Sequence, residues 1–319
     1  MIRLYKTSSL AFMFIISVMV LSVFAADNSG KGTINWNEGF VEAAGEGTAV
    51  ASGNKSKDKM SAGRVAEVKA QRALLETIKG VHVTSTTTVQ DSMLSEDIIK
   101  TKVEGIVKGA QVIDKKIETE SDGSIAVTVV MRVCLMGGMS CKGATLVQAL
   151  ELEKTPEPAF VPQKNLFQET PKQPAMEQPM NPVAEAPKQP PARPLSSNSC
   201  DLTKQVTGIV FSLDGRMYER VLMPVVVSES GNEESVKVYS AMLVKPAVFR
   251  TFGAIRYSDT VDGAIKQMHV CGNTLVVPVK EITKDNVIVI SARDLATIKE
   301  TLAHGNNYIE NAKVVISAQ

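Results

Sequence analysis

The chain has 319 residues, 22% of them charged, and its formal net charge at pH 7 is +1. Residues 27–150 hold 15 acidic and 15 basic side chains, and residues 200–319 hold 13 of each. Neither region has the basic excess that phosphate binding requires, which argues against nucleic acid and anionic membrane surfaces as partners.

The start of the sequence has the features of a secretory signal peptide over residues 1–25. Two basic residues precede an uncharged apolar run from Leu10 to Phe24, and cleavage is expected between Ala25 and Ala26. The alternative is an uncleaved anchor, but the run is shorter than the roughly 20 residues of a spanning helix. No cysteine follows the run to carry a lipid. We therefore expect an exported protein, periplasmic or associated with the cell envelope, with no membrane span after cleavage.

A proline-rich segment divides the rest of the chain. Eleven of the fourteen prolines lie between Thr155 and Ser199, and a segment with so few amide donors and apolar side chains does not form a core. We predict a disordered linker over residues 151–199, between domains at 36–150 and 200–319. The alternative, a ligand for an SH3-like module, rests on the motif PKQPPARP; a plain spacer is favoured.

The first domain opens with a strand and a helix. Gly39–Ala51 alternates, which places Gly45 and Gly47 with two apolar residues on one face. Two glycines weaken a strand, so a helix or another backbone is expected close against that face. A helix is predicted over Ser61–Lys79, stopped by Gly80. Its apolar stripe comprises Ala62, Val65, Ala66, Ala73, Leu74 and Ile78.

Residues 81–89, VHVTSTTTV, predict a second strand. Its valines, Val81, Val83 and Val89, form one face, and His82 and three threonines form the other. Threonine suits strands because its branched carbon packs on the pleat while its hydroxyl stays hydrated. The polar face is interpreted as a solvated sheet surface, or as a surface that a neighbouring subunit covers through hydrogen bonds.

A helix and a long hairpin complete the first domain. The helix is predicted over Asp91–Lys108, followed by Gly109. The hairpin turns at Asp122-Gly123, and apolar residues alternate from Ile125 to Val133 on its return. The predicted helical stripe comprises Leu94, Ile98, Ile99, Val103 and Ile106. The result is a β-α-β-α-β-β module whose antiparallel or mixed sheet is covered by helices on one face.

These segments carry a family resemblance. WNEGFVEAAGEG, SAGRVAEVKAQRALLETIKG, VHVTSTTTV and GAQVIDKKIETESDGSIAVTVVMRVCL, spanning Trp36–Leu135, together resemble the LPP-twenty lipoprotein family. The resemblance implies an envelope protein, and several relatives form rings or discs around the flagellar motor at the outer membrane. The family pattern includes no catalytic residues. This chain lacks the lipid-bearing cysteine, which argues against direct anchoring in the outer membrane.

Residues 200–319 predict a separate α+β unit. Six strand-like segments occur, with turns at Asp214-Gly215 and Ser230-Gly231. A helix follows Ser291, its N-cap with Asp294 as capping partner, and a shorter helix is expected over Ser258–Met268. The predicted fold class is therefore α+β, with two small domains, each a mostly antiparallel sheet with helices on one face, joined by the proline-rich linker.

The sequence predicts no catalytic, metal or cofactor site. The histidines, His82, His269 and His304, lie in different predicted elements without metal-ligand spacing. The loop GGMSCKGAT is similar to a phosphate-binding loop but inverts its Gly-Lys order. Arg293 and Asp294 could form a polar site, but helix capping already explains Asp294.

Two disulfides are predicted, Cys134 with Cys141 and Cys200 with Cys271. An even cysteine count in an exported chain favours pairing. A bond between the two pairs would have to tie the domains together across the linker, which favours pairing within each domain.

Two functions from different classes remain open. The first is a non-enzymatic envelope protein that acts by assembly, with other envelope proteins or as a homo-oligomer, through edge strands or the threonine face. The alternative is a periplasmic hydrolase or carbohydrate-acting enzyme with an unrecognised site. Glu42 and Glu46 share a strand face but would lie about 13 Å apart along it, beyond the usual separation of catalytic carboxylates. Assembly is favoured.

Overall fold

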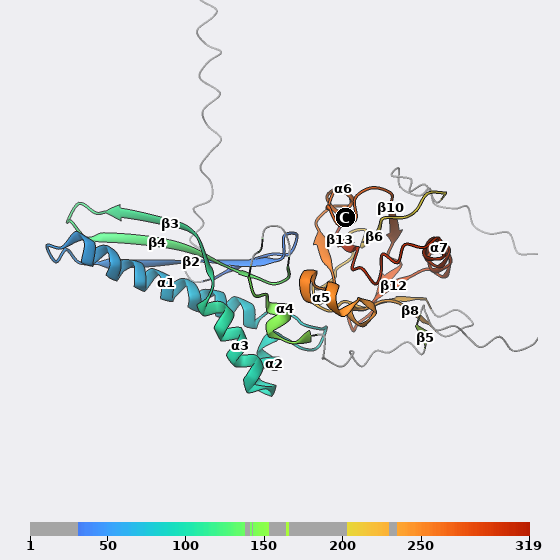
Figure 1. Ribbon diagram of the computed structural model, residues 1–319, viewed down its shortest axis with the longest axis horizontal. Helices are drawn as coiled ribbons and strands as arrows, with labels where there is room; N and C mark the ends of the chain where they lie inside the picture. The colour runs from blue at the N-terminus through green and yellow to red at the C-terminus, as the bar shows by residue number, and fades with distance from the viewer. Residues whose placement is uncertain (1–30, 138–140, 142, 153–163, 166–202, 230–234) are drawn as a thin grey trace, which may run out of the picture.

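The computed structural model describes residues 31–137, 141, 143–152, 164–165, 203–229 and 235–319. These residues form two α+β parts, an N-terminal part at 31–152 and a C-terminal part at 203–319 that includes the short strand at 164–165 (Figure 1). The predicted α+β class is confirmed. No helix in the described ranges is both long and apolar enough to cross a membrane.

The N-terminal part contains one antiparallel sheet in the order β1-β2-β4-β3. One long helix, α1, packs on β2 and β4 (Figure 1). We refer to α1, β2, β3 and β4 as the arm. The elements are β1 (Thr33–Asn35), β2 (Phe40–Ala49), α1 (Lys55–Lys79), α2 (Val89–Ser95), α3 (Asp97–Lys108), β3 (Gln111–Thr119), β4 (Ile125–Cys134) and α4 (Leu146–Ala149).

The glycines of β2 allow α1 to approach the sheet closely, as predicted. A β-carbon added at Gly45 would lie 2.1 Å from the carbonyl oxygen of Ala66, and one at Gly47 would lie 2.1 Å from that of Ala62. Helix α1 begins at Lys55, earlier than predicted, because the Asn54 side chain caps it by accepting the amide proton of Lys57. The close approach therefore depends on hydrogen in place of a side chain at both positions.

The predicted hairpin is confirmed. Strands β3 and β4 turn at Asp122-Gly123, where Gly123 has φ of +83° and donates its amide proton to the carbonyl of Glu120 at 3.0 Å. Along β4 buried and half-buried residues alternate from Ile125 onward. One face of β4 therefore lies under α1, and its other face is left partly open.

The strand predicted over residues 81–89 does not form, although Val81, Val83 and Val89 are buried as expected. Residues 82–88 make only an isolated bridge, and the amide of Val83 bonds to Thr87 within the segment. Thr88 instead caps α2 in a reciprocal arrangement with Asp91. Threonine hydroxyls compete for nearby backbone groups, and here helix capping prevails over strand pairing. The predicted polar sheet face does not exist.

The predicted helix over residues 91–108 is broken in two. Glu96 is extended, with φ of −140° and ψ of 115°, and separates α2 from α3. Ile99 and Val103 are buried as predicted, whereas Leu94 and Ile98 are 79% and 65% exposed. The buried residues of α3 are spaced by four, and Ile98 lies off that line, whereas Leu94 belongs to α2 on the other side of the break.

The C-terminal part contains two sheets. The sheet β10-β6-β13-β9 is parallel throughout, and β11-β12-β7-β8-β5 is mixed. The strands are β5 (Lys164–Asn165), β6 (Gly208–Ser212), β7 (Val226–Ser228), β8 (Val236–Tyr239), β9 (Arg256–Ser258), β10 (Thr274–Pro278), β11 (Glu281–Ile282), β12 (Ile288–Ile290) and β13 (Val314–Ser317). The helices are η2 (Ala241–Leu243), α5 (Pro246–Phe252), α6 (Val261–Ile265) and α7 (Ala292–Ala303).

The mostly antiparallel pattern predicted here does not hold for the first of these sheets. Helix α6 lies between β9 and β10, and such a connection can return the chain in the same direction, which a tight hairpin cannot. The helix after Ser291 is confirmed as α7, since Ser291 accepts the amide proton of Asp294 at 3.1 Å. The shorter helix predicted over Ser258–Met268 is present as α6, but it spans only Val261–Ile265, because Ser258 belongs to β9. Strand β9 and helix α5 were not predicted.

The linker prediction needs one correction. Lys164 and Asn165 form β5, which pairs with β8 in parallel. Neither Lys164 nor Asn165 is a proline, so both residues have the backbone N–H groups that sheet pairing needs. The rest of the proline-rich segment, apart from residues 151–152, lies outside the described residues, as does the turn at Ser230-Gly231.

Candidate interaction surface

Strand β3 is an open edge of the arm. It pairs with β4 on one side, and on its other side no strand of the described ranges pairs with it. All nine of its residues are exposed. Because an edge strand presents unpaired backbone donors and acceptors, β3 is a template for pairing with another chain.

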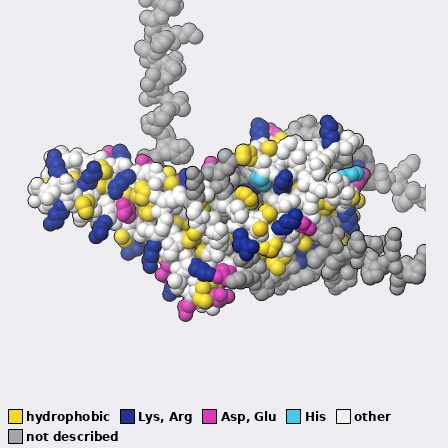
Figure 2. All heavy atoms as spheres, in the orientation of Figure 1, with side chains coloured by type: hydrophobic (Ala, Val, Ile, Leu, Met, Phe, Trp, Pro, Cys, Tyr) yellow, Lys and Arg dark blue, Asp and Glu magenta, His cyan; other side chains and the backbone are white. Residues whose placement is uncertain are grey.

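The side chains of β3 combine aliphatic and charged groups. Val112, Ile113 and Ile117 are 49%, 44% and 37% exposed. A register shift between Val112 and Asp114 marks a bulge, and the pairing with β4 is regular from Asp114 to Thr119. Figure 2 shows lysine and arginine side chains along the arm with apolar side chains between them. The bulge limits regular pairing along β3 to its C-terminal two thirds.

Three charges on β3 have partners within the chain. The Lys115 Nζ lies 3.3 Å from the Glu67 carboxylate of α1, and the Lys116 Nζ lies 2.7 Å from the Glu118 carboxylate. The hydrogen bond to Glu118 raises the pKa of Lys116. These pairs are solvated, so each contributes little to stability, but they fix where charge lies along the edge.

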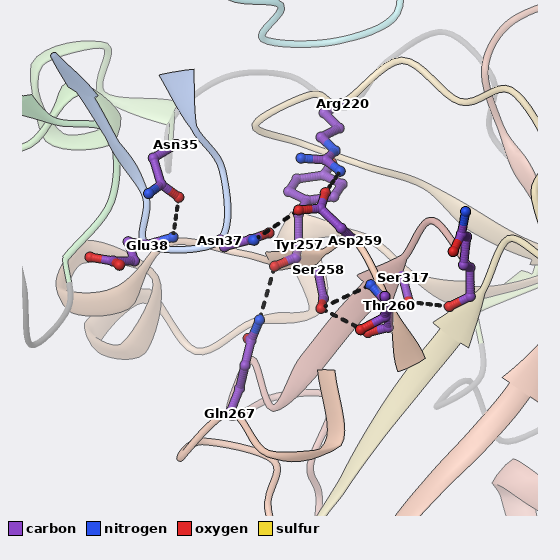
Figure 3. Close-up of polar contacts among 11 residues, drawn as sticks. Asn35, Asn37, Glu38, Arg220, Tyr257, Ser258, Asp259, Thr260, Gln267 and Ser317 are labelled. Atoms are coloured by element: carbon purple, nitrogen blue, oxygen red, sulfur yellow. Dashed lines mark hydrogen bonds and ion pairs between the residues drawn. The ribbon is translucent and has the colours of Figure 1, made fainter. Parts of the chain in front are cut away.

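The two parts of the chain meet at a polar contact around Asp259. Its carboxylate accepts hydrogen bonds from Arg220 at 2.6 Å and, across the junction, from Asn37 at 3.2 Å (Figure 3). The Arg220 bond, followed by that of Asn37, lowers the pKa of Asp259. The Trp36 ring lies edge-on to that of Tyr257, with centroids 5.3 Å apart. This junction borders a hollow of about 380 Å³ that Glu42 also lines.

The loop that was predicted as the threonine strand forms a second contact at the junction. The amides of Leu222 and Met223 donate to the carbonyls of His82 and Val83 at 3.0 and 2.9 Å. The His82 Nε2 also lies 3.0 Å from the Glu219 carboxylate. The apolar pattern of this segment therefore buries it against the C-terminal part instead of placing it in a sheet.

The disulfide between Cys134 and Cys141 is confirmed, and it closes the loop that makes a third contact. Arg256 donates to the carbonyls of Gly137 and Phe252, the latter at 2.6 Å, and lies 3.3 Å from the Met136 sulfur. Burial lowers the pKa of Arg256 to about 10. The disulfide thus fixes both ends of the loop that Arg256 holds.

The other predicted residues are distributed as follows. Cys271 is exposed and bonds to no described cysteine, and Cys200 lies outside the described residues, so their pairing stays a prediction. Ala25 and Ala26 also lie outside. The loop GGMSCKGAT is described only in part.

The acidic pair and the histidines are separate in space. The Glu42 carboxylate is bound by Arg132 at 2.7 Å, and the Arg132 guanidinium lies 3.7 Å from the centre of the Phe40 ring. Glu46 is exposed further along β2. His82 lies at the junction, His269 is half-buried after α6, and His304 is the C-cap of α7. No three metal-binding side chains cluster within the described ranges.

One family model matches the C-terminal part. Residues 208–318, from β6 to the end of β13, match the family described as Treponema pallidum Tp0624, second domain. The match covers less than half of the chain, and no curated protein matches the sequence. The limits of the matched segment agree with the extent of the C-terminal part, which indicates a multidomain architecture.

Sequence patterns missed the junction residues and did not identify β3 as the open edge. The hairpin was evident, but which of its strands lies outermost depends on β4 pairing with β2. Trp36, the only tryptophan of the sequence, is the first residue of the segment WNEGFVEAAGEG. Arg220, Tyr257 and Asp259 lie in loops and a short strand without a recognisable spacing.

Proposed function

We propose that the chain is a non-enzymatic protein of the cell envelope that acts by binding other proteins through the open edge of its arm. The observation that carries this proposal is the exposure of all nine residues of β3 along an edge with which no strand of the described ranges pairs. Addition of a strand to such an edge gives affinity through main-chain hydrogen bonds and specificity through alternate side chains.

The placement in the envelope rests on two features of the sequence and one of the structure. The first 25 residues predict export, and the segments from Trp36 to Leu135 resemble an envelope family with flagellar relatives. The disulfide between Cys134 and Cys141 suits an oxidising compartment such as the periplasm. A role beside a flagellar or outer-membrane structure belongs to this proposal as its most specific form.

The enzymatic alternative has less support. Glu42 is held in an ion pair with Arg132, and its neighbour Glu46 is exposed away from that pair. The guanidinium of Arg132 occupies the Glu42 carboxylate, so this group is not free to act on a substrate. The sheet face that carries these residues is better suited to contact with a protein than to acid catalysis.

Deletion of the gene tests the proposal. Loss of the protein is expected to impair motility or envelope integrity, and the wild-type chain is expected to restore it. Complementation with Ile117→Asp, which places a charge at the open edge, is expected to fail. Val68→Asp is the matched control, because Val68 is an exposed aliphatic residue of α1, 55% exposed, away from the edge.

Two results would contradict the proposal. A deletion without any motility or envelope defect would remove the envelope role. Full complementation by Ile117→Asp would show that the edge of β3 is not the binding surface. Equal thermal stability of the two variants is the check that both arms are folded.

A further inference from the structure

We infer that the partner of β3 is β3 of a second copy of this chain, paired antiparallel across a two-fold axis at Ile117. The two sheets would then form one continuous sheet of eight strands with both α1 helices on the same face. This inference rests on the proposed function, since it names the occupant of the same open edge.

The symmetry of such a pair limits the possible registers. In an antiparallel pair, opposite side chains point to the same face of the sheet. A two-fold axis perpendicular to the sheet relates each residue to a copy that points to the same face of the continuous sheet. One residue of β3 must therefore lie opposite its own copy, at the axis.

The charges of β3 decide which residue that is. Asp114, Lys115, Lys116 or Glu118 at the axis would place two like charges directly opposite each other, which is unfavourable. Within the regular stretch from Asp114 to Thr119, this leaves Ile117 and the terminal Thr119. A pair centred on Thr119 would set Glu118 against Glu120 of the partner. A register centred on Ile117 also brings like charges together, Asp114 opposite Glu120 of the partner, but this pair lies three residues from the axis, whereas Glu118 and Glu120 in the Thr119 register lie directly beside it. Ile117 is therefore the favoured residue at the axis.

In the register centred on Ile117, the charged pairs next to the axis are complementary. Lys116 of each copy lies opposite Glu118 of the other, on the open face of the sheet. Lys116 and Glu118 already pair within one chain at 2.7 Å, so the four groups would alternate in sign around the axis. The aliphatic side chains of the two Ile117 residues meet on the other face. The bulge at Val112 and Asp114 lies outside the central pairs.

The arrangement of the arm leaves room for this pairing. Helix α1 packs on β2 and β4, so the two strands of β3 would lie between the two helices (Figure 1). The C-terminal part joins the arm at the end of β4 remote from the hairpin turn (Figure 1). An antiparallel pair therefore directs the two C-terminal parts away from each other.

The second open edge of the sheet is a weaker candidate. From Ala43 to Ala49, the edge of β2 that faces away from β4 pairs with no described strand. The residues there, Ala43–Ala49, include Gly45 and Gly47 and no aliphatic side chain larger than alanine. Cross-strand side-chain pairs stabilise a sheet, and this edge supplies few of them.

Charge reversal tests the register in the purified full chain. Lys116→Glu and Glu118→Lys are each expected to weaken self-association roughly tenfold or more, because each sets two pairs of like charges against each other. The double variant, Lys116→Glu with Glu118→Lys, is expected to restore the wild-type association. Lys57→Glu, at an exposed position of α1, is the control for net charge. Sedimentation velocity over a range of concentrations measures the association.

Cysteine cross-linking locates the axis. Ile117→Cys is expected to form a disulfide with its own copy under mild oxidation, and peptide mapping identifies the linked peptide. Lys115→Cys is the matched control on the same strand and face. Its copy would lie about four residues, or roughly 14 Å, away along the strand, beyond disulfide reach.

The outcomes separate this inference from the proposed function. A wild-type chain that stays monomeric at every concentration, or self-association that neither single reversal weakens, would overturn the two-fold pair. A deletion phenotype that Ile117→Asp fails to complement would then still support binding of a different envelope protein at β3. A dimer restored by the double variant, without any deletion phenotype, would leave the inference standing and remove the proposed function.

Discussion

The arm and the C-terminal part use their strands in opposite ways. Along β4, buried and half-buried residues alternate, and every residue of β3 is exposed. In the C-terminal part, every residue of β8 and of β13 is buried. The arm is a two-layer structure with one helix on one face, whereas strands such as β8 and β13 in the C-terminal part are covered on both faces.

This difference shows where a partner can bind. Strands that are covered on both faces contribute their side chains to the core and leave none for contacts with another chain. The arm leaves one sheet face and one long edge available. The junction, where both parts contribute polar and aromatic groups, holds the arm against the compact C-terminal part.

The largest effect is expected from the close packing of the arm. Gly45→Ala would place a methyl group 2.1 Å from a carbonyl oxygen of α1 and 2.3 Å from an amide nitrogen. Neither backbone atom can move without shifting the helix, so we expect a loss of more than about 3 kcal/mol in the free energy of unfolding. Chemical denaturation measures it.

Gly105→Ala is the matched control for this change. Gly105 lies inside α3 with no atom within 4 Å of an added β-carbon, so alanine there should be neutral or stabilise by up to about 1 kcal/mol. Equal stability of the two variants would show that α1 does not lie as close to β2 as the structure has it.

Loss of the junction contact at Arg256 should have the next largest effect. Arg256→Ala leaves the carbonyls of Gly137 and Phe252 without their donor, and we expect a loss of about 2 to 3 kcal/mol. The fluorescence of Trp36 should change before the arm unfolds, because its ring contacts Tyr257 across the junction. Arg293→Ala, at an exposed position of α7, should change stability by less than about 0.5 kcal/mol. An unchanged Trp36 emission in Arg256→Ala would argue against the docking role.

The C-terminal part should be more sensitive to mild acid than the arm. Burial, followed by the positive charge of Arg256, lowers the pKa of His269 from 6.5 to about 4. Between these values the unfolded chain binds a proton that the folded chain does not, so stability falls as pH decreases from 6.5 towards 4. We expect a loss of roughly 2 kcal/mol over this window, allowing for partial solvent screening. Thermal unfolding against pH measures it, and His269→Gln should flatten the dependence. An equally steep dependence in that variant would assign the effect to other groups.

Loss of the disulfide should have an effect of similar size, in the loop that contacts Arg256. The double variant Cys134→Ser with Cys141→Ser opens a short loop, and we expect a loss of about 2.5 kcal/mol on the chain-entropy model. Limited proteolysis is expected to show faster cleavage near Gly137 while the hairpin of β3 and β4 stays protected. Unchanged cleavage in the double serine variant would mean that Arg256 holds the loop without help from the disulfide.

Several elements followed from sequence patterns alone. The alternation from Ile125 to Val133, the turn at Asp122-Gly123 and the cap at Ser291 involve residues close together in the chain, and all three are confirmed. The two glycines of β2 also indicated the close approach of α1, because glycine in a strand needs a packing reason. The bond between Cys134 and Cys141 was predictable because the other pairings of Cys134 would join the two domains across the linker.

Other features required the tertiary structure. The valines of residues 81–89 are buried as their pattern predicts, but burial does not specify strand pairing. The segment satisfies its backbone partly through Leu222 and Met223, which lie far away in the sequence. The order β1-β2-β4-β3, which makes β3 the open edge, likewise depends on pairing between β2 and β4, remote from each other in the chain. Local periodicity thus indicated most of the buried residues, although not the exposure of Leu94 and Ile98, and long-range pairing decided which strand remains open to a partner.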